Sequence, residues 1–105
     1  STREWRAAIT TPVQRCAAAA AFHAPTSRFL LFGGWNGSEV FADLLSLDAR
    51  GEVGAWTWAG VDMSPSIEGR FAACGAVCGG QLLLFGGMNF ERDHDELCAV
   101  AVPKR

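Results

Sequence analysis

The chain has 105 residues, half of them hydrophobic, and carries a formal net charge of −2 at pH 7. This size and composition suit one globular domain. The near-neutral charge and the lack of a basic cluster argue against nucleic acid or an anionic membrane as a partner. No apolar run approaches the roughly 20 residues that a membrane-spanning helix needs. Twelve glycines, four tryptophans and seven phenylalanines, without any tyrosine, favour a turn-rich β protein.

The sequence contains two copies of one pattern, about 53 residues apart. Phe29–Gly34 (FLLFGG) recurs as Leu82–Gly87 (LLLFGG), and upstream of each copy an arginine, Arg15 or Arg70, precedes small residues. A repeat of this period predicts a stacked or radial architecture. Such repeats specify a scaffold and leave activity to the loops, so the pattern is more informative about fold than about function.

Residues 1–14 are predicted to contain the outer strand of a preceding repeat, Glu4–Ile9, and the linker that follows it. The order Trp, Pro, Arg occurs here and again between the two copies: Trp5, Pro12 and Arg15, then Trp58, Pro65 and Arg70. The first complete repeat would then span residues 15–69, and residues 70–105 would form a second, incomplete repeat.

The first strand of each repeat is predicted over Cys16–Phe22 and Phe71–Val77. Five consecutive alanines in the first segment favour a helix by propensity alone. The second segment contains Gly75 and a β-branched valine and ends at a Gly-Gly turn signal. Because equivalent segments should share one conformation, we expect both to be strands. A strand nearest the axis of a radial array has little room for side chains, which would explain the Ala, Gly and Cys residues there.

The second strands, Phe29–Phe32 and Leu82–Phe85, are short, wholly apolar and followed by Gly-Gly, as expected of strands buried on both faces. Third strands are predicted over Phe41–Asp48 and Asp95–Val102. A fourth strand is predicted in the first repeat only, over Ala55–Ala59. It carries Trp56 and Trp58, which would share one side because residues two apart on a strand point the same way.

These residues resemble kelch repeats, in which an apolar strand ends in Gly-Gly and is followed by an Asp-Leu strand, a Trp, and then the Pro and Arg of the next repeat. The matching residues are Gly33, Gly34, Asp43, Leu44, Trp56 or Trp58, Pro65 and Arg70, with Gly86, Gly87, Glu96 and Leu97 in the second copy. The resemblance implies an all-β fold, a partial β-propeller of four-stranded antiparallel kelch blades. It also implies structural roles for Gly33, Gly34, Gly86, Gly87, Asp43, Trp56 and Trp58.

Two blades cannot close a ring, and an open pair exposes an edge strand and a blade face. Three explanations stay open: the chain is part of a longer protein, it is the visible part of one, or copies assemble together. The missing initiator methionine and the partial repeats at both ends favour an excerpt. We expect neighbouring blades as partners, and we do not expect a stable isolated monomer.

Strand alternation places the loops after the second strands at the same end as the connections between repeats. Aromatic, Met, Arg and amide side chains gather there, a composition typical of protein-binding surfaces. The candidate partner-binding residues are Trp35, Asn36, Met88, Asn89, Phe90, Arg92, His94, Arg15 and Arg70. The alternative is that both arginines bond internally to carbonyls of a neighbouring blade and that the loops are solvated turns.

The cysteines and the charged loop are interpreted without disulfides, metal or cofactor. Cys74 and Cys78 would lie about 13 Å apart on one strand, too far to bond, and reduced cysteines favour a cytoplasmic location, with cytoskeletal or nuclear association possible. In the charged stretch 91–96, Asp93 and Asp95 would point away from His94, which leaves no convergent third ligand.

No Ser/His/Asp or Cys/His arrangement stands out, so no catalytic residue is predicted. The leading hypothesis is a non-catalytic kelch segment that acts as a protein-interaction or scaffolding module through the loops named above. One alternative is a fragment of a propeller enzyme, galactose-oxidase-like or glycan-acting, with its catalytic residues in other blades. The absence of tyrosine excludes the tyrosine-dependent copper site of galactose oxidase from these residues. Another alternative is a structural subunit of a cytoskeletal or axonemal assembly.

Overall fold

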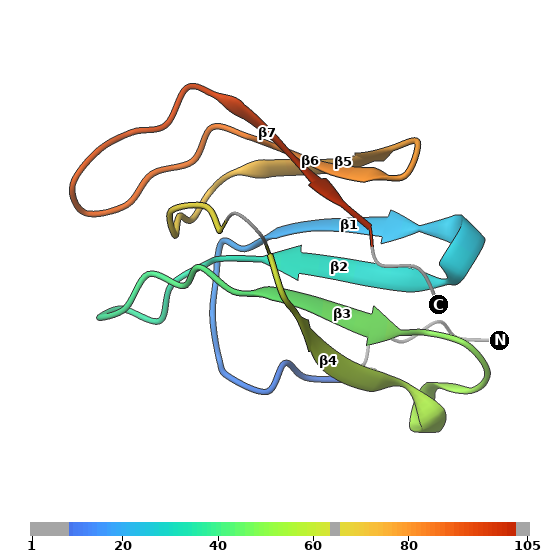
Figure 1. Ribbon diagram of the computed structural model, residues 1–105. Coiled ribbons are helices and arrows are strands. Elements are labelled where there is room, and N and C mark those ends of the chain that lie inside the picture. The colour runs from blue at the N-terminus through green and yellow to red at the C-terminus, as the bar shows by residue number, and fades with distance from the viewer. Residues whose placement is uncertain (1–8, 64–65, 103–105) are drawn as a thin grey trace, which may run out of the picture.

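A computed structural model describes residues 9–63 and 66–102, and this part of the chain is all-β (Figure 1). Two short 3-10 turns, η1 (Ala24–Thr26) and η2 (Val53–Ala55), interrupt the strands. The strands are β1 (Ala19–His23), β2 (Arg28–Phe32), β3 (Leu44–Asp48), β4 (Thr57–Val61), β5 (Cys74–Cys78), β6 (Gln81–Phe85) and β7 (Leu97–Ala101). No helix in the described ranges has the length and apolar character to cross a membrane.

The strands form two antiparallel sheets that follow chain order. The first sheet is β1-β2-β3-β4 and the second is β5-β6-β7. Their registers correspond: Phe32 pairs with Leu44 in the first sheet, and Phe85 pairs with Leu97 in the second. The two copies of the sequence pattern therefore fold alike over three strands, and residues in the same place of the two sheets are called counterparts below.

The alanine run forms strand β1 and not a helix, as the repeat predicts, but both inner strands begin later than predicted. Cys16 and Phe71, the predicted first residues, make isolated bridges to Trp35 and Met88. The chain then bends, because the residues that follow have left-handed backbones, with φ of 57° at Ala17 and 61° at Ala72. Regular pairing resumes only at β1 and β5.

The third strands also begin later than predicted, at Leu44 and Leu97. The fourth strand is displaced to Thr57–Val61 because the 3-10 turn η2 occupies residues 53–55. Trp56 therefore precedes β4, and the prediction that it shares one strand with Trp58 is wrong. Of the outer strand predicted over Glu4–Ile9, residues 4–8 lie outside the described residues, and Ile9 belongs to no strand.

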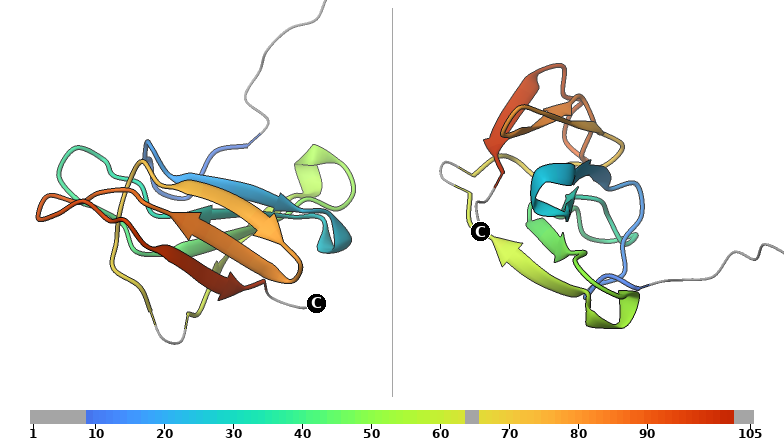
Figure 2. Two further views of the ribbon diagram at one scale, coloured as in Figure 1. Left: turned by 90° about the horizontal axis from the view of Figure 1, so that it is seen from above. Right: turned by 90° about the vertical axis from the view of Figure 1, so that its right-hand side faces the viewer.

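The two sheets contact one another along β1 and β5, and the first sheet fans away from this contact toward β4 (Figure 2). Small residues allow this close approach: a methyl group built on Gly75 would lie 3.2 Å from the carbonyl oxygen of Ala20 and 3.5 Å from the Cβ of Ala19. The shared core is made of buried side chains from both sheets. Its members are Ala19, Leu30, Phe32, Leu44, Leu82, Leu84 and Val102.

The first Gly-Gly pair lies at a close contact between the two repeats. Gly33 has φ of +72°, and a Cβ there would lie 2.3 Å from the carbonyl oxygen of Arg70. The adjacent Gly34 donates its N–H to that same oxygen over 2.9 Å. This close contact joins the end of β2 to the second repeat, and only a residue without a side chain fits it.

Candidate functional site

Three segments meet at one end of the molecule, here called the loop end. They are the β2–β3 loop (33–43), the β6–β7 loop (86–96) and the described residues 66–73 of the connection that precedes β5 (Figure 1). Arg92 pairs with Glu68 across two of these segments, and Trp35 stacks on Phe71 across two of them. The shared end predicted from strand alternation is thus present.

An aromatic cluster joins the three segments. The rings of Trp35 and Phe71 stack with centroids 5.2 Å apart, and Phe90 meets the edge of Trp35 at 5.8 Å. Phe90 is 63% exposed, and its neighbour Met88 is also exposed. Each such ring pair contributes about 0.5–1.5 kcal/mol beyond area burial. The cluster therefore fixes the loops and still presents apolar surface to solvent.

Arg15 and Arg70 lie inside the protein, with side chains only 3% and 2% exposed. Arg15 donates to both carboxylate oxygens of Asp43, at 2.6 and 3.1 Å, and lies over the ring of Phe41. It also donates to the carbonyl oxygen of Gly33. Each of these bonds lies within the first repeat, so Arg15 fastens the ends of its own loop.

Arg70 repeats this arrangement in the second sheet. It donates to Glu96 over 3.2 Å and approaches the carbonyl oxygen of Gly86 at 3.5 Å. Both arginines thus bond internally, as the alternative in the sequence analysis stated. The carbonyl oxygens of Gly33 and Gly86, however, belong to the same repeat as the arginine that each contacts. Their guanidinium groups are not available to a partner, which leaves them out of the candidate surface.

The two asparagines shape the turns of the loops. Asn36 Oδ1 accepts the backbone N–H groups of Ser38 and Glu39, at 3.0 and 2.8 Å. Asn89 Oδ1 accepts those of Glu91 and Arg92, at 2.9 and 3.1 Å. Such side-chain bonds replace backbone turn bonds. Both loops are therefore held in a defined shape by the asparagines that sequence reasoning proposed as contact residues.

An ionic network lies beneath the β6–β7 loop and centres on Glu68. The hydrogen bonds from Arg92, and then from Asn89, lower the pKa of the Glu68 carboxyl to about 2. The same carboxylate, through its own bond, raises the pKa of Arg92. His94 is buried, with Nε2 3.4 Å from Glu68 and Nδ1 3.3 Å from Glu96. The network therefore ties the loop to the connection that precedes β5.

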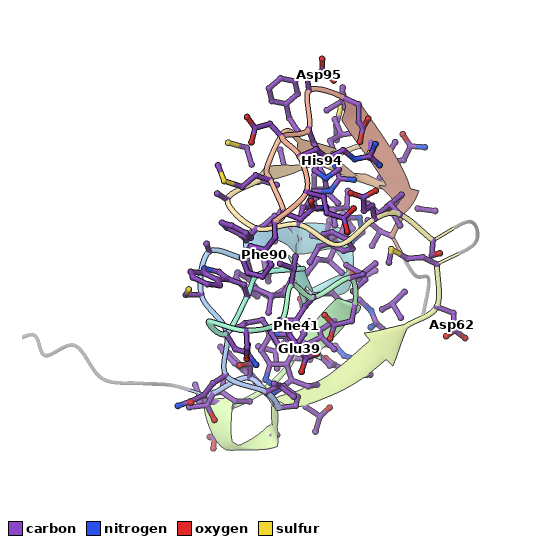
Figure 3. The ribbon with its side chains drawn as sticks, turned by 90° about the vertical axis from the view of Figure 1, so that its left-hand side faces the viewer. Glu39, Phe41, Asp62, Phe90, His94 and Asp95 are labelled. Carbon is purple, nitrogen blue, oxygen red and sulfur yellow. The ribbon has the colours of Figure 1, made fainter. Side chains whose placement is uncertain are left out.

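Figure 3 shows the side chains at this end, with Phe90 and His94 on the β6–β7 loop and Phe41 and Glu39 on the β2–β3 loop. A groove of about 400 Å³ runs between these loops, and Val40, Glu68, Phe90 and Glu91 are among its lining residues. Its lining combines one exposed aromatic ring with carboxylates.

Sequence reasoning did not single out Phe71, Phe41 or the individual role of Glu68. The repeat provides no signal for Phe71, because its counterpart at the same distance after the arginine is Cys16. Phe41 was assigned to a strand, whereas it lies in the loop under Arg15. Glu68 is recognisable only once its partner Arg92, 24 residues away, is placed beside it.

The described residues contain neither a cluster of metal-ligating side chains nor a disulfide bond. No group of three His, Cys, Asp or Glu side chains in them lies so as to hold a metal ion. All four cysteines are free. Asp93 and Asp95 are exposed while His94 between them is buried, which agrees with the expectation that the aspartates lie away from the histidine.

A scan against protein-family models and a search of curated proteins each find no match to this chain. The kelch resemblance thus depends on the residue pattern alone and stays a prediction.

Proposed function

We propose that this chain is a non-catalytic segment of a kelch-type β-propeller that serves as a protein-interaction or scaffolding module. Its partner would bind at the loop end. The single observation that carries the proposal is the aromatic cluster there, which keeps Phe90 largely exposed although three segments converge around it. Exposed aromatic and Met side chains at one site are enriched where proteins bind one another.

The rigidity of the loops supports the same proposal. Each loop is closed by a buried arginine and shaped by an asparagine. Loops that are already ordered lose little conformational freedom on binding, so more of the contact energy becomes affinity.

The repeat supports the propeller part of the proposal. Two sheets of equal register, joined along inner strands of small residues, are the arrangement expected of adjacent blades. The partner at the loop end would be a protein, because the lining of the groove offers aromatic and carboxylate groups and no basic cluster for nucleic acid.

A peptide-display selection against the immobilised chain tests the proposal. We expect selected peptides to lose at least ten-fold in affinity when Phe90→Ser and Met88→Ser are combined. The matched control is Val53→Ser, an exposed apolar residue in η2 at the opposite end of the molecule, which should leave affinity unchanged. A selection that yields no peptides, or peptides that bind the loop variant equally well, would overturn the proposal.

A further inference from the structure

Within residues 9–63 and 66–102, one apolar face of the second sheet has no layer packed on it. In the register of β5, β6 and β7, alternate residues point away from the first sheet: Cys74, Ala76, Leu83, Phe85, Leu97 and Ala99, with Cys78, Gln81 and Ala101 at the far end. Gln81 is the one polar side chain among them. Phe85 and Leu97 are 54% and 62% exposed. An apolar sheet face of this kind normally packs against another layer.

The first repeat shows what covers this face. The counterparts of Phe85 and Leu97 are Phe32 and Leu44, which are only 1% and 2% exposed. They are buried because the inner face of the second sheet, with Leu82, packs on them. The corresponding face is thus covered in the first repeat and open in the second repeat.

The chain also carries the surface that would cover it. Within the chain, Gly75, Val77 and Leu82 lie on the inner face of the second sheet, which packs on the first sheet. Their counterparts in the first repeat are Ala20, Phe22 and Phe29, which lie on the outer face of the first sheet. Ala20 and Phe22 are both exposed. Beside them an apolar cavity of about 260 Å³ is lined by Phe22, Phe29, Leu47, Ala49 and Trp56.

We propose that the outer face of the second sheet binds the outer face of the first sheet of a second copy of this chain, head to tail. The interface would repeat the contact already made within the chain, with β5 of one copy against β1 of the other. On this outer face Leu31, Leu45 and Leu47 are already buried within the chain, whereas Ala20 and Phe22 on β1 are exposed. The contact between copies would therefore be made mainly by β1 of one copy and β5 of the other. Because the two surfaces differ, the association is heterologous and continues into a ring or a chain of copies.

The internal contact gives the geometry for a crosslink. Within the chain, a Cβ on Gly75 would lie 3.5 Å from the Cβ of Ala19. Between copies, the counterparts are Ala20 of one chain and Cys74 of the other, both exposed. Their Cβ atoms would be about 3.5 Å apart, at the lower end of the disulfide range of roughly 3.5–4.5 Å. The two chains must separate by a few tenths of an ångström to admit the Ala20 methyl.

The test places Ala20→Cys in a background of Cys16→Ser, Cys78→Ser and Cys98→Ala, which retains Cys74. Mild oxidation should produce covalent dimers and longer species on a non-reducing gel, and only when Ala20→Cys is present. Oxidised protein that stays monomeric would overturn the proposal. Dimers formed in equal yield without Ala20→Cys would also overturn it. Such dimers would show that Cys74 of one chain bonds to Cys74 of another, as in a symmetric pairing of two second sheets.

A second measurement keeps the proposal falsifiable if the crosslinking variant does not fold. Sedimentation of the natural chain should show a mass above the monomer, and combined Phe85→Ser and Leu97→Ser should shift it to the monomer. Both side chains are largely exposed, so the variant should keep the β-sheet circular dichroism spectrum. Val53→Ser, which changes an exposed apolar residue in η2 outside both sheet faces, is the control and should leave the mass unchanged. A natural chain that sediments as a monomer at high concentration would contradict the proposal.

Discussion

Phe32 and Phe85 occupy the same place in the two repeats, each at the end of an apolar strand and before Gly-Gly. One is buried in the core between the sheets, and the other faces solvent. Their local sequence, strand register and turn are alike, so the difference arises entirely from what lies against the sheet. Burial in this fold is therefore a property of the neighbouring layer, and each repeat depends on the next for its stability.

The largest expected effect comes from truncating the two phenylalanines. Phe32→Ala should lower the free energy of unfolding by about 3–5 kcal/mol, because it opens a cavity in the core. Phe85→Ala should change it by less than about 1 kcal/mol in dilute solution, where that side chain is already hydrated. Urea titrations at low protein concentration measure both. Equal losses would show that the two sheets are packed alike and would remove the basis of the comparison.

The glycines at the ends of β2 and β6 sharpen the same comparison. Gly33 and Gly86 both have φ of +72°, so alanine at either position pays about 1–2 kcal/mol for a left-handed backbone. A Cβ on Gly33 would also meet the Arg70 carbonyl oxygen at 2.3 Å, whereas on Gly86 the nearest atom is 3.6 Å away. We expect Gly33→Ala to lower the melting temperature more than Gly86→Ala does. The reverse order would contradict the described contact between the repeats.

The buried arginines test whether the loops depend on internal bonding. Arg70→Met keeps the apolar stem but leaves the carbonyl oxygens of Glu68 and Gly86 without their donor. A lost buried hydrogen bond costs about 1–3 kcal/mol. Arg50→Met, which changes an exposed arginine paired with Asp48, is the control and should cost less than about 1 kcal/mol. Thermal unfolding followed by circular dichroism distinguishes the two.

The smallest expected effect concerns acid. The pKa of Glu68 is lowered to about 2 by Arg92 and Asn89. Its contribution to stability is therefore fully present above its unfolded pKa of roughly 4.5 and is lost as pH falls toward about 2. The β2–β3 loop has no such network, since Val13 stands where the second repeat has Glu68.

We expect Glu68→Gln to flatten the fall in stability between pH 4.5 and 2 by a small amount, because the carboxylate is exposed to solvent screening. Paired urea titrations at these pH values measure the effect. An unchanged pH profile in the variant would show that the network does not contribute to folding.

Much of the strand order could be predicted from the sequence because the repeat gives two sequences for each of the first three strands, and each sequence can be checked against the other. The apolar strands before Gly-Gly were placed within a residue or so of β2 and β6. The alanine run was assigned correctly because Gly75, its counterpart in the second copy, argues against a helix. The strand starts were missed because left-handed backbones at Ala17 and Ala72 follow from the close packing of the repeats and not from alanine itself.

The loop end was located from topology, but the roles of its residues required the structure. Asp43 lies 28 residues from Arg15, and Glu96 lies 26 residues from Arg70. Pairings over such distances depend on how the sheets bring the loops together, which composition does not encode. Likewise, the two repeats have the same sequence pattern, so the pattern does not predict which of the two sheets has another layer packed on it.

Alkylation of the native cysteines tests the central claim, that the sheets pack through inner faces and leave the outer face of the second sheet open. Cys98 lies on the inner face of β7, and Cys74 lies on the outer face of β5. Mass spectrometry after brief iodoacetamide treatment of dilute protein should show Cys74 and Cys78 modified well before Cys98, with the difference abolished in denaturant. Equal rates at Cys74 and Cys98 in the native protein would contradict the account.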